Sequence, residues 1–193
     1  ARALAAAWPG GVRPAASPAP PRRAGPVLAL AGSLSPVSRA QVARAEGFVR
    51  HAADPARLAD DGGALAGLAE RIAAGLAAGQ DVLVETALPD GAALPPAAAA
   101  RVTARLGAAI LARTVPGLLA IAGGDTSSHA VQALDLWALA HAGSAAPGVA
   151  HCLARSDDPR LDGLSIVLKG GQMGPPDLFA RLRTDRLPDI PAA

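Results

Sequence analysis

The sequence predicts an α/β protein, built as a mostly parallel sheet with helices on both faces. Fully apolar runs of five residues recur along the chain, such as VLALA at 27–31 and LLAIA at 118–122. Segments with helical spacing of apolar residues separate these runs. Strands that are apolar at every position are typical of parallel sheets, because helices cover both of their faces.

The composition restricts which residues can fill the core and which partners the chain can bind. With 193 residues the chain is expected to form one domain with a sizeable core. Aromatic residues make up only 2% against 51% for all hydrophobic residues, so Ala, Leu and Val must fill that core. A net charge of +2 without a run of Lys and Arg argues against nucleic-acid binding. Cys152 is the single cysteine and no apolar stretch is long enough to cross a membrane, so we expect a cytoplasmic protein that binds no membrane.

The two ends differ in composition from the rest of the chain. Residues 1–8 have the pattern of the last turns of a helix, and we interpret them as the tail of a preceding domain. Residues 9–26 are dense in Pro, Gly and Ser, which is typical of an extended linker. The folded domain is therefore expected to span 27–187, with 188–193 as a tail.

Local signals place the individual elements. Ser35 before Pro36 marks a helix start, because Ser caps free amides and Pro tolerates the first helical position. Gly79 closes a second helix and a proline pair opens a third. We interpret Trp137 as a packing residue on the face of a later helix. In order, the expected elements are strand 27–31, helix 35–49, helix 64–79, strand 81–87, helix 95–115, strand 118–122, helix 127–143, strands 148–154 and 164–169, and helix 176–183.

Three of the strands end in glycine-rich turns: GSLS after 27–31, GGDTSS after 118–122 and GGQMG after 164–169. The carboxyl ends of parallel strands share one edge of the sheet, where ligands of open α/β folds bind. Glycine lets a ligand approach the backbone, and free amides at helix starts favour phosphate. Hydroxyl groups in the turns are expected to hydrogen-bond phosphate oxygens, and Lys169 supplies a positive charge. The turns therefore predict a phosphate site.

Each residue also has a structural interpretation. One glycine-rich turn is ordinary in α/β proteins, Ser35 is a good helix cap, and Asp125 suits an N-cap as well as a role near metal or ribose. The chain has neither GxxxxGK[ST] nor a tight GxGxxG. The histidines lack metal-ligand spacing, and the acidic loop at 157–162 is more typical of a solvated turn than of a magnesium site. Spacing alone thus indicates an anion-binding α/β domain.

Four blocks carry the prediction further: VLALAGSLSPVSRAQV, IAGGDTSSHAVQAL, APGVAHCLA and IVLKGGQMGPPDLF. Their order and spacing resemble the C-terminal nucleotide-binding domain of the four-carbon acid sugar kinase family, which includes 3-oxo-tetronate, threonate and erythronate kinases. The third turn departs from that family's usual Lys-Ser-Gly-Asn-Phe-Gly. The resemblance implies contacts with ATP from all three turns. The predicted nucleotide-binding residues are Ser33, Ser35, Gly123, Gly124, Asp125, Thr126, Ser127, Lys169, Gly170, Gly171 and Gly174.

The resemblance also implies a reaction and its partners. The γ-phosphoryl group of ATP, held with Mg²⁺, would pass to the terminal hydroxyl of a four-carbon sugar acid. The sugar acid would bind to the preceding domain, so this chain alone is expected to bind nucleotide weakly and to phosphorylate nothing. A homodimer is expected from the family. The alternatives are a non-catalytic module that binds a nucleotide or phosphometabolite, and a dinucleotide domain, which the missing GxGxxG disfavours.

Overall fold

A computed structural model describes residues 24–33, 35–86 and 94–184. The expected tails at 1–8 and 188–193 and most of the linker at 9–26 lie outside the described residues. The helices and strands are β1 Val27–Ala31, α2 Pro36–Ala43, β2 Val49–Ala53, α3 Pro55–Asp60, α4 Gly62–Ala77, β3 Val82–Thr86, α5 Pro96–Leu111, β4 Leu118–Ala122, α6 Gly124–Ala133, β5 Ala138–Ala146, β6 Val149–Arg155, β7 Ser165–Lys169 and α7 Leu178–Arg183.

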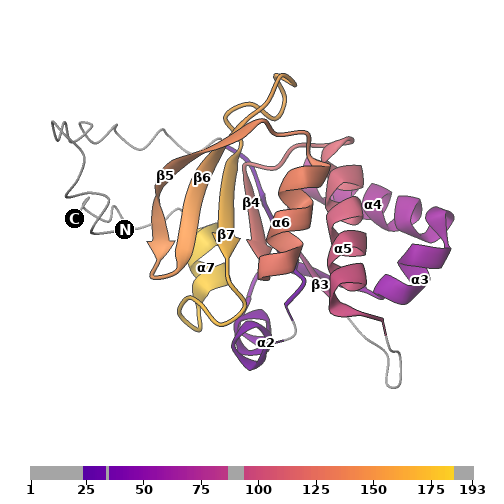
Figure 1. The fold of residues 1–193 in the computed structure, drawn as a ribbon, viewed down its shortest axis with the longest axis horizontal. Coiled ribbons are helices and arrows are strands. Elements are labelled where there is room, and N and C mark those ends of the chain that lie inside the picture. Colours follow the sequence, from indigo (N-terminus) through magenta and orange to yellow (C-terminus); the bar gives the residue numbers. More distant parts are fainter. Residues whose placement is uncertain (1–23, 34, 87–93, 185–193) are drawn as a thin grey trace, which may run out of the picture.

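One sheet of seven strands forms the centre of the molecule, in the order β2-β3-β1-β4-β7-β6-β5 (Figure 1). The five strands from β2 to β7 in that order are parallel, whereas β6 runs antiparallel to both β7 and β5. The predicted α/β class with a mostly parallel sheet is confirmed. The hairpin of β5 and β6 extends this sheet at one side.

Hydrophobic packing is divided between the two faces of the sheet. Leu28 and Leu30 belong to one buried cluster with residues of α3, α4, α5 and α6. Val27 and Ala29, which alternate with them along β1, belong to a second cluster with residues of α2 and α7. Because neighbouring strand residues point to opposite faces, α2 and α7 pack on one face and the other helices on the opposite face. Leucine fills the first face of β1, while Val27, Ala29 and Ala31 form the second.

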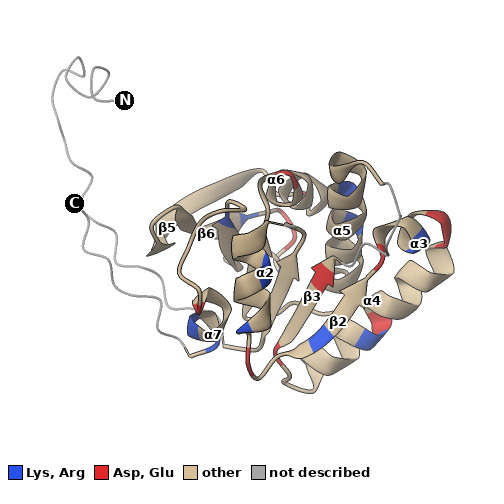
Figure 2. Ribbon diagram, turned by 90° about the horizontal axis from the view of Figure 1, so that it is seen from below, with Lys and Arg blue, Asp and Glu red and all other residues tan. Residues whose placement is uncertain are grey.

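Charged side chains are spread thinly over this framework. Lys, Arg, Asp and Glu of both signs are interspersed along the ribbon (Figure 2). The acidic loop forms ion pairs at its own edge, since Asp158 pairs with Arg160 at 2.6 Å and Asp162 with Arg155 at 3.7 Å. None of the described helices combines the length and the apolar character needed to span a membrane.

The prediction of one helix over 127–143 is wrong. Helix α6 ends at Ala133, and Asp135 adopts a positive φ of 52°, the left-handed conformation that commonly terminates helices. The chain then forms β5, which pairs with β6. Trp137 accordingly does not pack on a helix and is 68% exposed. The helix expected over 35–49 is also shorter, since α2 ends at Ala43 and β2 begins at Val49. Neither β2 nor α3 was predicted.

Candidate functional site

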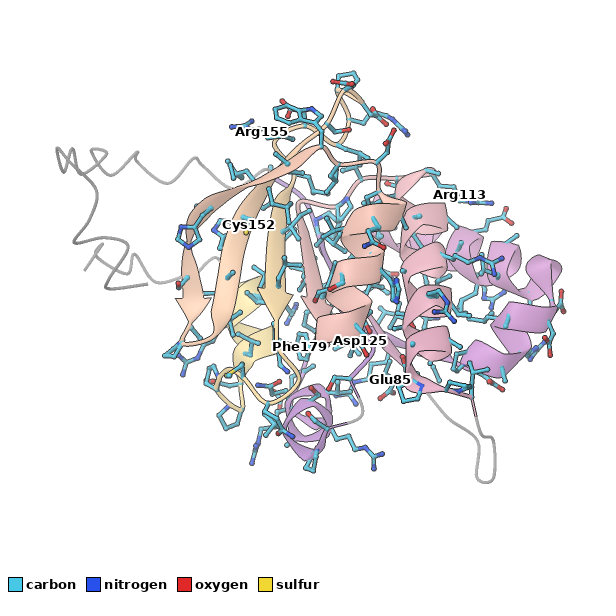
Figure 3. All side chains as sticks on the ribbon, in the orientation of Figure 1. Glu85, Arg113, Asp125, Cys152, Arg155 and Phe179 are labelled. Atoms are coloured by element: carbon cyan, nitrogen blue, oxygen red, sulfur yellow. The ribbon has the colours of Figure 1, made fainter. Side chains whose placement is uncertain are left out.

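Four parallel strands end in register at one edge of the sheet. Ala31, the last residue of β1, pairs with Glu85 of β3 and with Ala122 of β4. Ala122 in turn pairs with Lys169, the last residue of β7. Asp125 and Glu85 both lie at this edge, while Arg113 and Arg155 lie at the opposite one (Figure 3). All three glycine-rich turns therefore leave the sheet side by side.

Backbone hydrogen bonds join the three turns. The amides of Gly32 and Ser33 both donate to the carbonyl oxygen of Ala122, each at 3.0 Å. The amide of Gly123 donates to the carbonyl oxygen of Lys169 at 2.9 Å. The first turn is thus attached to the second, and the second to the third. The structure brings together the segments that the sequence predicted to meet.

The turn after β4 presents a free helix start. Gly124 and Asp125 are exposed in the first turn of α6. The amides of residues 124–126 have no acceptor among the described residues, as expected for the first turn of a helix. Thr126 is buried, and its side chain lies directly against Gly32. A β-carbon at residue 32 would overlap the Thr126 side chain. Thr126 therefore packs the second turn against the first and does not face solvent.

Ser35 is the N-cap of α2, as the structural interpretation of the sequence predicted. Its Oγ accepts from the amide of Ser38 at 3.1 Å, which caps α2. The same Oγ lies 2.6 Å from the carbonyl oxygen of Gly171, to which it donates. Because a hydroxyl has one hydrogen, this donor is already used within the protein.

Lys169 is buried, with 2% of its surface exposed. Its ammonium donates to Ser38 Oγ at 2.9 Å and to the carbonyl oxygens of Gly170 and Gly171 at 3.0 Å each. Burial lowers the pKa of Lys169 to about 8. Within the described ranges no carboxylate lies within 4.0 Å of this ammonium. Such a charge is rare in proteins without a counter-ion, and it makes the edge favourable for an anion.

The remaining predicted residues line or support the same edge. Ser33, Gly170 and Gly171 are partly exposed, and a β-carbon on Gly171 would lie 2.9 Å from Ser33 Oγ. Ser127 is partly exposed, but its Oγ is covered and has no hydrogen-bond partner in the described part of the chain. Gly174 is partly exposed too, and a β-carbon on it would lie 3.1 Å from side-chain atoms of Leu178 and Val149.

Sequence reasoning missed three residues of this edge. Ser38 and Gln41 are buried polar residues of α2, and Glu85 is the penultimate residue of β3, where it pairs with Ala31. Gln41 Nε2 donates to the carbonyl oxygens of three successive residues, Met173, Gly174 and Pro175, at 2.8–3.1 Å. The sequence did contain a signal for the burial of Ser38 and Gln41, because the two residues are one helical turn apart on the same face as Val42.

The chain is similar to characterised kinase sequences over most of its length. Residues 28–179 match the family described as "Nucleotide-binding C-terminal domain". A 3-oxo-isoapionate kinase from Paraburkholderia graminis is 36% identical over 183 residues, covering 83% of this chain and 39% of the relative. A 3-oxo-tetronate kinase from Cupriavidus necator is 37% identical over 166 residues, covering 80% and 37%. The chain thus spans about two fifths of these relatives.

Solved structures share the fold. A protein of unknown function from Bordetella bronchiseptica, crystallised with citrate as a domain-swapped dimer, superposes with a TM-score of 0.69 at 26% identity, over 82% of this chain and 40% of that one. A Haemophilus influenzae protein superposes with a TM-score of 0.69 at 23% identity, over 84% of this chain and 41% of that one. At that identity the second likeness indicates the fold alone.

Proposed function

Because this chain belongs to the four-carbon acid sugar kinase family, as its nucleotide-binding C-terminal domain, we propose that it binds ATP at the carboxyl edge of its parallel strands. In a longer protein it would supply the γ-phosphoryl group for transfer to the terminal hydroxyl of a four-carbon sugar acid. The name of one relative, a 3-oxo-tetronate kinase, supports this substrate class, and both relatives are named as kinases.

One observation carries the proposal. Three turns that are hydrogen-bonded to one another bring peptide amides without a partner among the described residues to the same edge as the buried Lys169 ammonium. The turns are joined through Ala122 and Lys169, as described. Among the described residues, the first amides of α6 have no hydrogen-bond partner and the Lys169 ammonium has no carboxylate beside it. A polyphosphate supplies what both lack, namely acceptor oxygens and negative charge.

The residues present suit phosphoryl transfer, which depends on positioning and charge neutralisation more than on covalent chemistry. Ser33, Gly123, Gly124 and Thr126 belong to the turns that would hold the phosphates with amides and hydroxyls. Mg²⁺ would neutralise charge between the β- and γ-phosphates, and Asp125 and Glu85 are the carboxylates at this edge that suit its hydration shell. The sugar acid would bind to a further domain of the longer protein, which also carries the group that orients the acceptor hydroxyl. A homodimer, as in the Bordetella structure, would be compatible with this arrangement.

Calorimetric titration of this chain with Mg-ATP and separately with NAD tests the nucleotide class. We expect ATP to bind and NAD to show no specific binding, because no dinucleotide motif is present. Tighter binding of NAD would refute the proposal. Asp125→Asn then separates a kinase from a non-catalytic binding module. In a protein that joins this domain to an acceptor-binding domain, the substitution should abolish phosphoryl transfer with the fold intact, whereas a module would show no transfer even before the change.

A further inference from the structure

The third turn, residues 170–175, is held through its carbonyl groups. Three donors converge on the carbonyl oxygen of Gly171: Ser35 Oγ at 2.6 Å, Ser38 Oγ at 2.9 Å and Lys169 Nζ at 3.0 Å. Lys169 also holds the carbonyl oxygen of Gly170 at 3.0 Å. Gln41 of α2 donates to the carbonyl oxygens of residues 173–175 in the same way. The turn is therefore fixed from the side of α2.

Lys169 has no donor left for a phosphate in this arrangement. An ammonium has three N–H groups, and Ser38, Gly170 and Gly171 accept one each. Direct contact with a phosphate would break at least one of these bonds in a buried site, which costs free energy. The geometry thus separates Lys169 from the direct ligands.

Peptide planarity gives these contacts a second effect. In a trans peptide the C=O and N–H bonds point in opposite directions. With the carbonyls of Gly170 and Gly171 directed at Lys169, the following amides, those of Gly171 and Gln172, point away from it. Neither amide has a hydrogen-bond partner among the described residues. Gly171 is partly exposed beside Ser33, and Gln172 is exposed.

We propose that Lys169 is a positioning residue that acts with Ser38 to turn the Gly171 and Gln172 amides toward the phosphates of the nucleotide. The inference rests on the proposed ATP site for its ligand, but the orientation of the two amides is a property of the protein without nucleotide. Lys169 thereby contributes by shaping the turn and by its field, and the peptide amides make the contacts.

Nuclear magnetic resonance of the nucleotide-free chain tests the positioning directly. Lys169→Met keeps the length of the side chain and removes its donors, and Ser38→Ala removes one partner. Both should displace the amide resonances of Gly171 and Gln172. Both should also speed hydrogen exchange at the Met173 amide, which donates to the Gly170 carbonyl at 3.1 Å, about tenfold or more. Ser165→Ala, an equally buried serine at the other end of β7, is the matched control and should change neither.

Calorimetry with Mg-ATP provides the second arm. Ser38→Ala should weaken ATP binding about tenfold, although Ser38 faces Lys169 and Gly171 and not the ligand. The double variant should bind ATP no more weakly than Lys169→Met alone, because both substitutions release the same turn. If Lys169→Met does not fold, Ser38→Ala against Ser165→Ala still decides the question.

The two proposals fail in different ways. If the unchanged chain binds no ATP, the proposed function fails, and the resonance experiment still decides the role of Lys169. The positioning role is overturned if Lys169→Met leaves the Gly171 and Gln172 resonances in place while ATP binding falls, which would make the ammonium a direct phosphate ligand. It is also overturned if Ser38→Ala behaves like Ser165→Ala in both arms.

Discussion

The parallel part of the sheet and its antiparallel hairpin differ in burial and in what they support. Strands β1 and β4 are buried at all five of their residues, whereas β5 is buried only at its last two of nine. The turns after β1, β4 and β7 are hydrogen-bonded to one another, while β5 pairs with β6 alone. A ligand site needs turns held on a rigid support, and the structure provides this only where the strands are covered on both faces.

The largest expected contrast comes from two glycines with positive φ. Gly123, with φ 126°, lies in the second turn, where a β-carbon would be 3.2 Å from the Ser33 backbone nitrogen. Gly143 of β5, with φ 149°, has open space around it. Gly123→Ala should lower the free energy of unfolding by about 2 to 5 kcal/mol, from strain and overlap together, and should abolish ATP binding.

Gly143→Ala is the matched control for this substitution. It should cost about 1 to 3 kcal/mol from strain and leave ATP affinity unchanged. Urea unfolding and calorimetry on both variants measure the contrast. Equal losses of ATP affinity in the two variants would contradict the assignment of the site to the parallel edge.

The next largest contrast is expected in the pH dependence of stability, which should have opposite signs for one residue of each region. Burial lowers the pKa of Lys169 in β7 from 10.5 to about 8, and burial raises the pKa of Cys152 in β6 above 9.0. Between pH 8 and 10.5 the unfolded chain keeps a lysine proton that the folded chain has released, so the contribution of Lys169 to stability rises with pH. Above pH 9.0 the folded chain keeps a thiol proton that the unfolded chain has lost, so the contribution of Cys152 falls.

Urea unfolding of the unchanged chain, Lys169→Met and Cys152→Ala from pH 7 to 10 isolates the two contributions. The difference in unfolding free energy between the unchanged chain and Lys169→Met should increase by on the order of 2 kcal/mol over this range. The corresponding difference for Cys152→Ala should decrease. Changes of the same sign for both residues would show that burial does not control their titration.

The smallest effect is expected at Trp137, before the hairpin. Its side chain is 68% exposed, so Trp137→Ala should change the unfolding free energy by less than about 0.5 kcal/mol and leave ATP affinity unchanged. Phe179→Ala in α7 is the control, because Phe179 is 1% exposed and its loss should cost about 3 to 5 kcal/mol. A large loss of ATP affinity in Trp137→Ala would assign a binding role to the hairpin region.

The difference in burial between the central parallel strands and the edge strands also decides which strands could be predicted from the sequence. Strands 27–31 and 118–122 were predicted at their observed bounds, since covered strands must be apolar at every residue. The edge strands lack that constraint. In β2 the residues VRHAA are mostly exposed, and β5 is rich in Ala, which suits a helix as well as a strand. Nothing in the spacing marks Ala133 as the residue at which α6 ends, or Asp135 as the left-handed residue that follows.

The expectation that the three glycine-rich turns meet is confirmed, because topology alone determines their proximity. The turns containing Ser33, Gly123 and Gly170 had to meet once their strands were parallel neighbours. The supporting contacts were not predictable in the same way, because Ser38 and Gly171 are 133 residues apart and touch only after α2 packs beside the third turn. The sequence indicated Lys169 as a positive charge for phosphate, whereas its three acceptors within the protein depend on how the turn and α2 pack around it.

The strand order has a consequence for biosynthesis. Strand β7 is the last of the described strands to leave the ribosome, yet it lies between β4 and β6, which are made before it. Until it arrives, the facing margins of β4 and β6 present unpaired peptide groups that can recruit another chain. The carboxyl edge of the parallel strands is consequently completed only when β7 joins the sheet, and a nascent chain stalled before residue 165 would be prone to misassembly.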